Sequence, residues 1–243
     1  MVKFDVNLSI GRWPFRPLPH AEMKELVPYL AGHGIEGGLL RSAEGAFSSD
    51  PEAENETLLK RCKGYKNFIP LLIANPFYKS FRQWNDVPAA VLYPGFQRFS
   101  LTAPETVAMA ETLGSRGTKI LVVVMREEDE RAQHPLCKIP AVPVESLEGF
   151  AQALPGMTVI ALNAYVGEAL RFTAPNLYCD TAFIEGFPAL APLAAKEKCG
   201  KLLFGTHAPF LCASASVSKV AALDEKNRSA MSETLRNIFR HLI

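Results

Sequence analysis

Three polar side chains alternate with apolar ones near the start of the chain, a pattern that could gather ligands for a metal ion or a substrate. Asp5, Asn7 and Ser9 are spaced by two, so an extended strand places all three on one face. The opposite face then carries the apolar side chains of Phe4, Val6 and Leu8. The neutral oxygen atoms of Asn7 and Ser9 form hydrogen bonds, and an asparagine oxygen suits hard cations better than zinc. We expect the polar face to point into a site at the end of this strand.

Groups that could transfer protons follow other apolar segments. His207 comes directly after one such segment, His134 lies in a long connection after another, and Asp180 lies at the end of a third. Histidine titrates near neutral pH without perturbation, so His207 and His134 are our candidates for a general acid or base. Asp180 is the candidate second carboxylate. The alternative for His207 is a loop residue bonded to backbone.

Arginines and amides could hold an anionic substrate at the same place. Arg12 lies in the aromatic loop after the first segment, Arg41 ends the second, and Arg126 opens a charged run that follows a later one. A planar guanidinium binds both oxygens of a carboxylate. Our substrate-binding candidates are therefore Asn7, Ser9, Arg12, Arg41, Arg126 and Asn163. The alternative is that the arginines form solvated turns and surface charge.

Eight apolar segments are typical of parallel strands covered on both faces. They are residues 3–9, 36–41, 68–74, 89–93, 119–125, 158–163, 176–181 and 201–206. Helical periodicity marks residues 21–33, 52–62, 104–113, 146–154, 187–198 and 227–242. This alternation in 243 residues predicts an α/β protein with a single (β/α)8 TIM barrel over residues 1–243. A doubly wound open sheet is the alternative, weakened because no G-x-G-x-x-G follows a strand.

The composition argues against several kinds of partner. A net charge of +1 with scattered basic residues does not favour nucleic acid. No run approaches the roughly 18 apolar residues of a membrane span, and a strand predicted within three residues of the start leaves no room for a signal peptide. The five dispersed cysteines are expected to be reduced thiols in a cytoplasmic protein. We expect a small-molecule substrate and leave a homo-oligomer open.

Three segments carry a resemblance to a known family. D-V-N-L-S at residues 5–9 is placed like the family's D-x-H-x-H, and N-L-Y-C-D-T at residues 176–181 is similar to its N-x-Y-x-D-T/S. K-L-L-F-G-T-H-A-P at residues 201–209 is similar to R-x-L-F-G-S/T-D-x-P. In this order and spacing the chain resembles the amidohydrolase-related (amidohydrolase 2) family, which includes aminocarboxymuconate-semialdehyde-decarboxylase-like enzymes. The resemblance implies a TIM-barrel hydrolase or decarboxylase that depends on a metal.

The same resemblance implies a divalent metal held by histidines after strands one, five and six and by an aspartate after strand eight. Here the corresponding positions hold Asn7, Ser9, Arg126, Asn163 and His207. Amide, hydroxyl and guanidinium groups are poor zinc ligands, and a guanidinium repels a cation. We therefore expect degenerate metal ligands and no cofactor; if one binds, it should be a divalent metal such as zinc.

The expected function is hydrolysis or decarboxylation of a small carboxylated compound, which the resemblance implies. A non-catalytic ligand-binding or scaffold protein on the same barrel is the first alternative, since a fold alone does not define a function. The second alternative is a rearranged metal site, built from His134, His207, Glu128 and Asp180. Metal analysis of the purified protein tests the hypothesis of a rearranged metal site against the two hypotheses without a metal.

Overall fold

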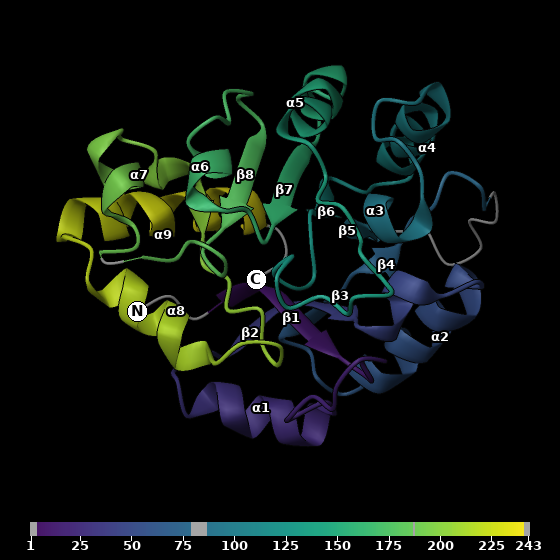
Figure 1. Cartoon of the computed structure of the whole chain (residues 1–243), viewed down its shortest axis with the longest axis horizontal. Coiled ribbons are helices and arrows are strands. Elements are labelled where there is room, and N and C mark those ends of the chain that lie inside the picture. Colours follow the sequence, from purple (N-terminus) through teal and green to yellow (C-terminus); the bar gives the residue numbers. More distant parts are fainter. Residues whose placement is uncertain (1–3, 79–86, 187, 241–243) are drawn as a thin grey trace.

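Parallel strands of aliphatic residues form the centre of the molecule, and helices lie outside them (Figure 1). The computed structural model describes residues 4–78, 87–186 and 188–240. Its strands are β1 Phe4–Ile10, β2 Gly37–Ser42, β3 Phe68–Pro70, β4 Leu72–Ile73, β5 Ala89–Leu92, β6 Ile120–Val124, β7 Thr158–Leu162, β8 Leu177–Asp180 and β9 Leu202–Leu203. Lys3, which begins the first predicted strand, lies outside the described residues.

The strands close into one ring. Parallel pairing joins β1, β2 and β3 in one sheet and β4 to β9, in chain order, in another. Only Leu71 separates β3 from β4, and its N–H donates to the carbonyl of Leu40 at 2.8 Å. The segment around β9 returns to β1, because the amides of Val6 and Ser9 donate to the carbonyls of Phe204 and Ala208, both at 2.9 Å. The predicted TIM barrel is confirmed, with β3 and β4 as two parts of one predicted strand.

The helices largely follow the predicted segments. Those expected from periodicity are α1 Met23–Ala31, α2 Pro51–Cys62, α4 Pro104–Ser115, α5 Val144–Ala153, α7 Ala191–Ala195 and α9 Glu225–Phe239. Phe187 and Leu242, which bound two predicted helices, lie outside the described residues. Three helices were not expected: α3 Pro94–Gln97, α6 Val166–Ala169 and α8 Ala213–Ala221. The first two are single turns, which are too short to show a hydrophobic periodicity. Helix α8 buries mostly small side chains, so its sequence shows no stripe of large apolar residues.

The barrel interior is an apolar core closed at its amino-terminal end by the last helix. The inward side chains of the strands form one cluster with α9, through residues such as Leu39, Val122 and Leu162. At the bottom of this cluster the ring of Phe239 on α9 lies 5.0 Å from the ring of Phe4. The opposite faces of the strands pack in a second cluster against the outer helices. No described helix is long and apolar enough to cross a bilayer.

The first strand departs from strict alternation. Its register against β2 shifts between Asp5 and Leu8, which marks a β-bulge. Val6 therefore belongs to the interior cluster, whereas Leu8 packs in the outer cluster. The expectation that Phe4, Val6 and Leu8 share one face is wrong, because the extra residue at the bulge reverses the faces of everything after it. Because of the bulge, the side chain of Val6 packs in the barrel interior while the side chain of Asn7 faces the carboxyl ends of the other strands.

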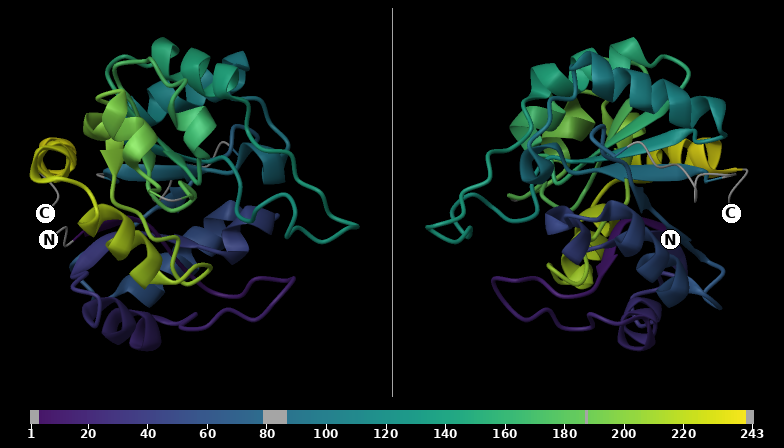
Figure 2. Two further views of the ribbon diagram at one scale, coloured as in Figure 1. Left: turned by 60° about the vertical axis from the view of Figure 1, so that its left-hand side comes forward. Right: turned by 90° about the vertical axis from the view of Figure 1, so that its right-hand side faces the viewer.

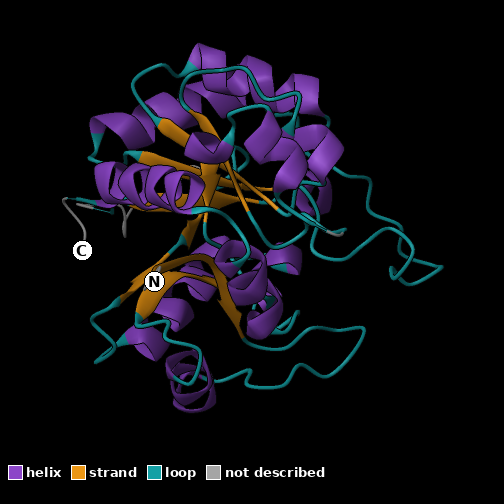
Figure 3. Ribbon diagram, turned by 90° about the vertical axis from the view of Figure 1, so that its left-hand side faces the viewer, coloured by secondary structure: helices purple, strands orange, loops and turns teal. Residues whose placement is uncertain are grey.

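Two long loops leave the carboxyl ends of strands on the same side of the molecule (Figures 2 and 3). One connects β1 to α1 and the other connects β6 to α5. They contact each other, because the ring of Phe15 in the first stacks on that of His134 in the second at 5.7 Å. In TIM barrels the loops at this end of the strands carry the functional residues.

Candidate functional site

Asn7 is the hub of a polar network at the carboxyl ends of the strands. Its side-chain N–H groups donate to Asn163 Oδ1 and Asp180 Oδ2, both at 2.7 Å. Its Oδ1 accepts from Arg41 Nη2 at 3.1 Å. We call the group Asn7, Arg41, Glu127, Asn163, Asp180 and His207 the strand-end network. All six side chains are buried, so they join β1, β2, β7 and β8 with the segments that follow β6 and β9 without contact with solvent.

An ion pair lies at the centre of the strand-end network. Arg41 binds both carboxylate oxygens of Glu127, with Nη2 to Oε2 at 2.8 Å and Nη1 to Oε1 closer still. Neither side chain is exposed to solvent. Burial raises the pKa of Glu127, and the adjacent guanidinium of Arg41 opposes that shift. A carboxylate in this position neutralises the arginine, so Arg41 is not free to bind a substrate anion from solution.

His207 is held as a neutral ring with both nitrogens engaged. Nε2 lies 2.7 Å from the carbonyl oxygen of Glu127, so it carries the proton and donates it. Nδ1 then accepts from Arg41 Nη2 at 3.1 Å. Burial and the nearby charge of Arg41 lower the pKa of His207 well below its ordinary value. Phe210 stacks on the ring at 4.6 Å, which separates it from the outside.

Arg126 binds the segment that follows β7 and does not line an open site. Its guanidinium binds Glu168 on α6 through two hydrogen bonds, of 2.7 and 2.5 Å, and donates to the carbonyl of Asn163 at 2.7 Å. It lies 4.0 Å from the ring centre of Tyr165. Asn163 adopts a positive φ of 64° there, a conformation that asparagine tolerates better than most residues. Its backbone N–H thereby donates to Asp180 Oδ1 at 2.8 Å.

Asp5 and Ser9 lie beside the strand-end network and not within it. Asp5 accepts hydrogen bonds from the hydroxyl of Thr206 at 2.6 Å and from the backbone N–H of Asn7 at 2.8 Å. Burial raises the pKa of Asp5 to about 7, against these hydrogen bonds, which lower it. The hydroxyl of Ser9 is buried and has no hydrogen-bond partner among the described residues. Neither side chain is open to a substrate.

The raised pKa of Asp5 makes the stability of the fold depend on pH. Its folded-state pKa lies above the unfolded value, so its contribution is fully present in acid and is lost as the pH rises through about 7. Relative to Asp5→Asn, the wild type should lose at most about 1.4 kcal/mol per pH unit between the unfolded-state pKa of about 4 and the folded-state pKa of about 7. Urea unfolding of both proteins at several pH values between 5 and 8 measures the difference. Parallel stability curves would show that Asp5 does not titrate there.

A second feature, open to solvent, lies above the strand-end network. It is a small hollow between the two long loops, which we call the outer hollow, lined by Trp13, Phe15, Phe96, Glu128, Gln133, His134, Cys137 and Ile139. Trp13 is only 5% exposed, and its Nε1–H has no hydrogen-bond partner among the described residues. A buried indole N–H normally has an acceptor, so a donor without one among the described residues is unusual.

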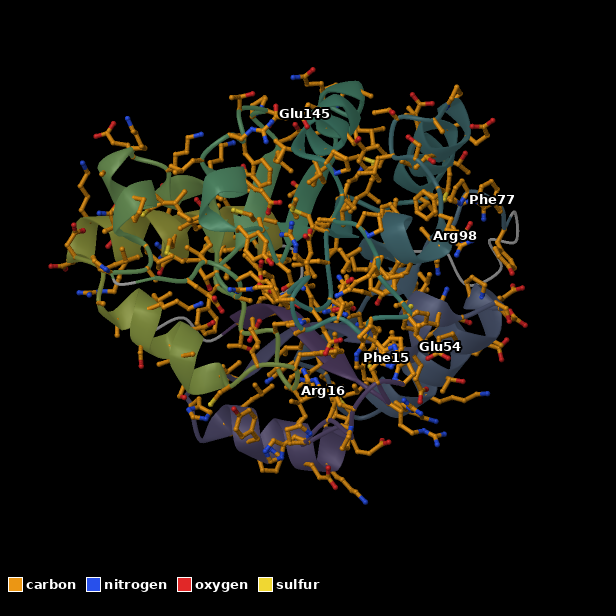
Figure 4. All side chains as sticks on the ribbon, in the orientation of Figure 1. Phe15, Arg16, Glu54, Phe77, Arg98 and Glu145 are labelled. Atoms are coloured by element: carbon orange, nitrogen blue, oxygen red, sulfur yellow. The ribbon has the colours of Figure 1, made fainter. Side chains whose placement is uncertain are left out.

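Phe210 and two charged residues separate the outer hollow from the network beneath it. The ring of Phe210 lies 5.1 Å from that of Trp13 on one side and stacks on His207 on the other. Arg16 donates to Glu128 Oε1 at 2.9 Å and to the carbonyl of Phe210 at 3.1 Å. Figure 4 labels Phe15 and Arg16 next to each other on the loop after β1. Glu127 therefore pairs inward with Arg41, whereas its neighbour Glu128 pairs outward with Arg16.

The structure separates the candidate residues that the sequence suggested. Asn7, Arg41, Asn163, Asp180 and His207 meet in the strand-end network, with Arg126 bonded to it. Arg12 lies apart: its side chain is 93% exposed and pairs with Glu44. His134 lies in the outer hollow, separated from the network by Phe210. The expectation of one cavity lined by all of them is wrong, because the network is packed shut and the loop residues stay outside.

Several residues of this region were not singled out from the sequence. Glu127 is the partner of Arg41, and Glu168 is the partner of Arg126. Phe210 separates the two features by packing against Trp13, which belongs to the aromatic loop already noted in the sequence. A buried arginine requires a carboxylate partner, and that requirement is the signal that could have directed attention to the glutamates near the strand ends.

The strand-end network does not fit a divalent metal. Among the described residues, no three histidine, cysteine, aspartate or glutamate side chains are placed to hold one. The oxygen of Asn7 and the free lone pair of His207 both face the guanidinium of Arg41, which is itself a cation. The rearranged site of His134, His207, Glu128 and Asp180 is excluded by the same geometry, because His134 and Glu128 line the outer hollow while the other two are sealed below.

Known structures share this fold, although no family model and no curated protein matches the sequence. 5-Carboxyvanillate decarboxylase LigW from Sphingomonas paucimobilis is 12% identical with a TM-score of 0.71, and the match covers 98% of each chain. Amidohydrolase 2 from Bifidobacterium longum subsp. infantis is 14% identical with a TM-score of 0.63, again over 98% of each chain. Dihydroxybenzoic acid decarboxylase from Polaromonas sp. JS666, solved with manganese and 2-nitroresorcinol, is 14% identical with a TM-score of 0.65, over 98% of this chain and 96% of that one.

At such low identity these similarities establish the fold. They confirm the TIM barrel, and they confirm the resemblance to the amidohydrolase-related family at the level of the fold. The metal in the solved relative is manganese, so zinc has no specific support.

Proposed function

We propose that this protein binds a small carboxylated aromatic compound in the outer hollow and acts on it as a hydrolase or decarboxylase, with no metal ion in the strand-end network. The observation that carries this proposal is the aromatic hollow beside the strand ends, with Trp13 in its wall and a buried indole N–H on Trp13 that has no hydrogen-bond partner among the described residues. The hollow lies at the end of the barrel where enzymes of this fold bind their substrates. The fold is shared with decarboxylases of carboxylated phenols, which supports that substrate class.

The groups around the outer hollow match such a ligand in kind. The rings of Trp13, Phe15 and Phe96 offer apolar faces to an aromatic ring. The Trp13 N–H can donate to a carboxylate or phenol oxygen, and Arg16, which is 41% exposed, adds positive charge nearby. His134 is exposed and accepts from the N–H of Leu136 through Nδ1, so its Nε2 is the accessible group for moving a proton.

A non-catalytic ligand-binding or scaffold protein is the second candidate. The observation in its favour is that His207 and Asp180 are fully buried and bonded within the strand-end network. In this alternative the outer hollow binds the ligand without turnover. We further propose a cytoplasmic location, in keeping with free thiols at all five cysteines, and a small molecule as the partner instead of nucleic acid or membrane.

A ligand screen tests the proposal. Ligand-observed NMR with 2,6-dihydroxybenzoate should show binding to the wild type, while resorcinol, which lacks the carboxylate, should bind at least about 10-fold more weakly, as the loss of a charge-assisted hydrogen bond predicts. Trp13→Phe keeps the ring and removes the N–H, so it should weaken binding by a similar factor. Phe77→Ala is the matched control, since Phe77 is 66% exposed and far from Phe15 in Figure 4.

The same samples separate the two candidate functions. Release of carbon dioxide or loss of a hydrolysable ester or amide group, unchanged by chelator and reduced about 10²-fold by His134→Ala, supports the enzyme. Binding without turnover across a panel of carboxylated aromatics supports the ligand-binding protein. Equal binding of 2,6-dihydroxybenzoate by the wild type and Trp13→Phe would contradict the proposed site.

A further inference from the structure

Three acceptor atoms converge on a single nitrogen of Arg41. Nη2 lies 2.8 Å from Glu127 Oε2, 3.1 Å from Asn7 Oδ1 and 3.1 Å from His207 Nδ1. A guanidinium nitrogen of this kind has two hydrogens, so it cannot give each acceptor a hydrogen bond of its own. A carboxylate oxygen, an amide oxygen and an imidazole nitrogen around one point form a ligand set for a cation.

The orientation of His207 agrees with that description. Its Nε2–H is fixed on the carbonyl oxygen of Glu127 at 2.7 Å, which leaves the Nδ1 lone pair directed at Arg41. Metal-binding histidines are held in the same way, with the second ring N–H donated to a carbonyl or carboxylate that fixes the tautomer. The backbone at His207 has a positive φ of 58°, an uncommon conformation for this residue. Such strain is retained where the surroundings determine the direction of a side chain.

We propose that the guanidinium of Arg41 occupies a cation site built by Asn7, Glu127 and His207, and that removal of the guanidinium exposes a site for one divalent cation. The position is buried, and Arg41 supplies from within the chain the positive charge that Glu127 requires. The ligands lie within 3.1 Å of Nη2, so movements of less than about 1 Å would bring them to the 2.0–2.6 Å range of metal–ligand bonds. This inference is independent of the outer hollow and of the proposed function.

The test is titration with Mn²⁺ alone, followed by electron paramagnetic resonance of the free ion. The wild type should bind no Mn²⁺ in the strand-end network, while Arg41→Ala should bind one ion per chain at least about 10-fold more tightly than any residual binding by the wild type. Arg41→Ala/His207→Ala should lose about 10-fold or more of that affinity, in line with the loss of one ligand. Arg41→Lys is the matched control, because its ammonium keeps a cation in the site and should prevent the gain.

A buried cavity beside an unpaired glutamate can prevent folding, so a second variant and a second readout are needed. Arg41→Gln fills more of the space and also leaves Glu127 without a cation. If either variant is unfolded alone, millimolar Mn²⁺ should restore its cooperative thermal transition. The proposal is overturned if neither variant gains affinity or is refolded by Mn²⁺. It is also overturned if the double variant binds as tightly as Arg41→Ala, because the ion would then lie elsewhere.

Discussion

Replacing Glu127 with alanine should lower the free energy of unfolding by about 3–5 kcal/mol, the usual cost of leaving a fully buried charge without its partner. Arg41 and Glu127 are both completely inaccessible to solvent, and the glutamate binds both ends of the guanidinium. Asn7 and His207 remain as acceptors but bring no negative charge. A chain of this length should show a decrease in Tm of roughly 10 °C. Urea denaturation and calorimetry provide the two measurements.

The matched control for this substitution is Glu130→Ala. Glu130 is an exposed glutamate in the same loop as Glu127, and its loss should change stability by less than about 0.5 kcal/mol. If Glu127→Ala were as stable as Glu130→Ala, the guanidinium of Arg41 would have to reach solvent, and the closed strand-end network described above would be incorrect.

Asn7→Asp should destabilise the fold by about 3 kcal/mol at pH 8, the lower end of the cost of an uncompensated buried charge, although it changes only one heavy atom of the side chain. The amide of Asn7 donates to Asp180 Oδ2 at 2.7 Å, so the substitution puts two carboxylates in contact. Two buried carboxylates this close cannot both ionise, and one pKa of the pair must rise. The folded pair then holds a proton more tightly than the unfolded chain, so the variant recovers stability in acid and loses it as the pH rises.

Ser9→Ala is the control for Asn7→Asp on the same strand. The Ser9 hydroxyl is buried without a partner among the described residues, so its removal should leave stability within about 0.5 kcal/mol or increase it. Urea unfolding at pH 5 and pH 8 compares the three proteins. A loss in Asn7→Asp that is equal at both pH values would show that the two carboxylates do not share a proton.

The strand-end residues could be predicted from the sequence because a barrel gathers its strand ends on one face. Arg41, Asn163 and Asp180 each lie at or directly after the carboxyl end of a strand, and Asn7 lies within β1 and faces them, so the order of the strands brings them together. His207 joins them because the segment after β9 pairs with β1. The position of these residues along the strands was therefore sufficient to predict most of the strand-end network.

Loop residues could not be placed in the same way. Glu127 and Glu128 are adjacent in a charged run, yet one pairs inward with Arg41 and the other outward with Arg16. Their directions depend on the path of the loop, which periodicity does not describe. Arg12 and His134 belong to long loops that lead away from the strand ends. The bulge in β1 also has no local signal in the sequence, since Val6 and Leu8 are equally apolar.

A crystal structure of the wild-type protein soaked in MnCl₂, with anomalous scattering recorded to locate the ion, would show whether Arg41 or a metal ion occupies the strand-end network. We expect Arg41 to contact Asn7, Glu127 and His207, and we expect no anomalous peak within the strand-end network. An anomalous peak coordinated by His207 and Glu127, with the guanidinium displaced, would contradict this expectation.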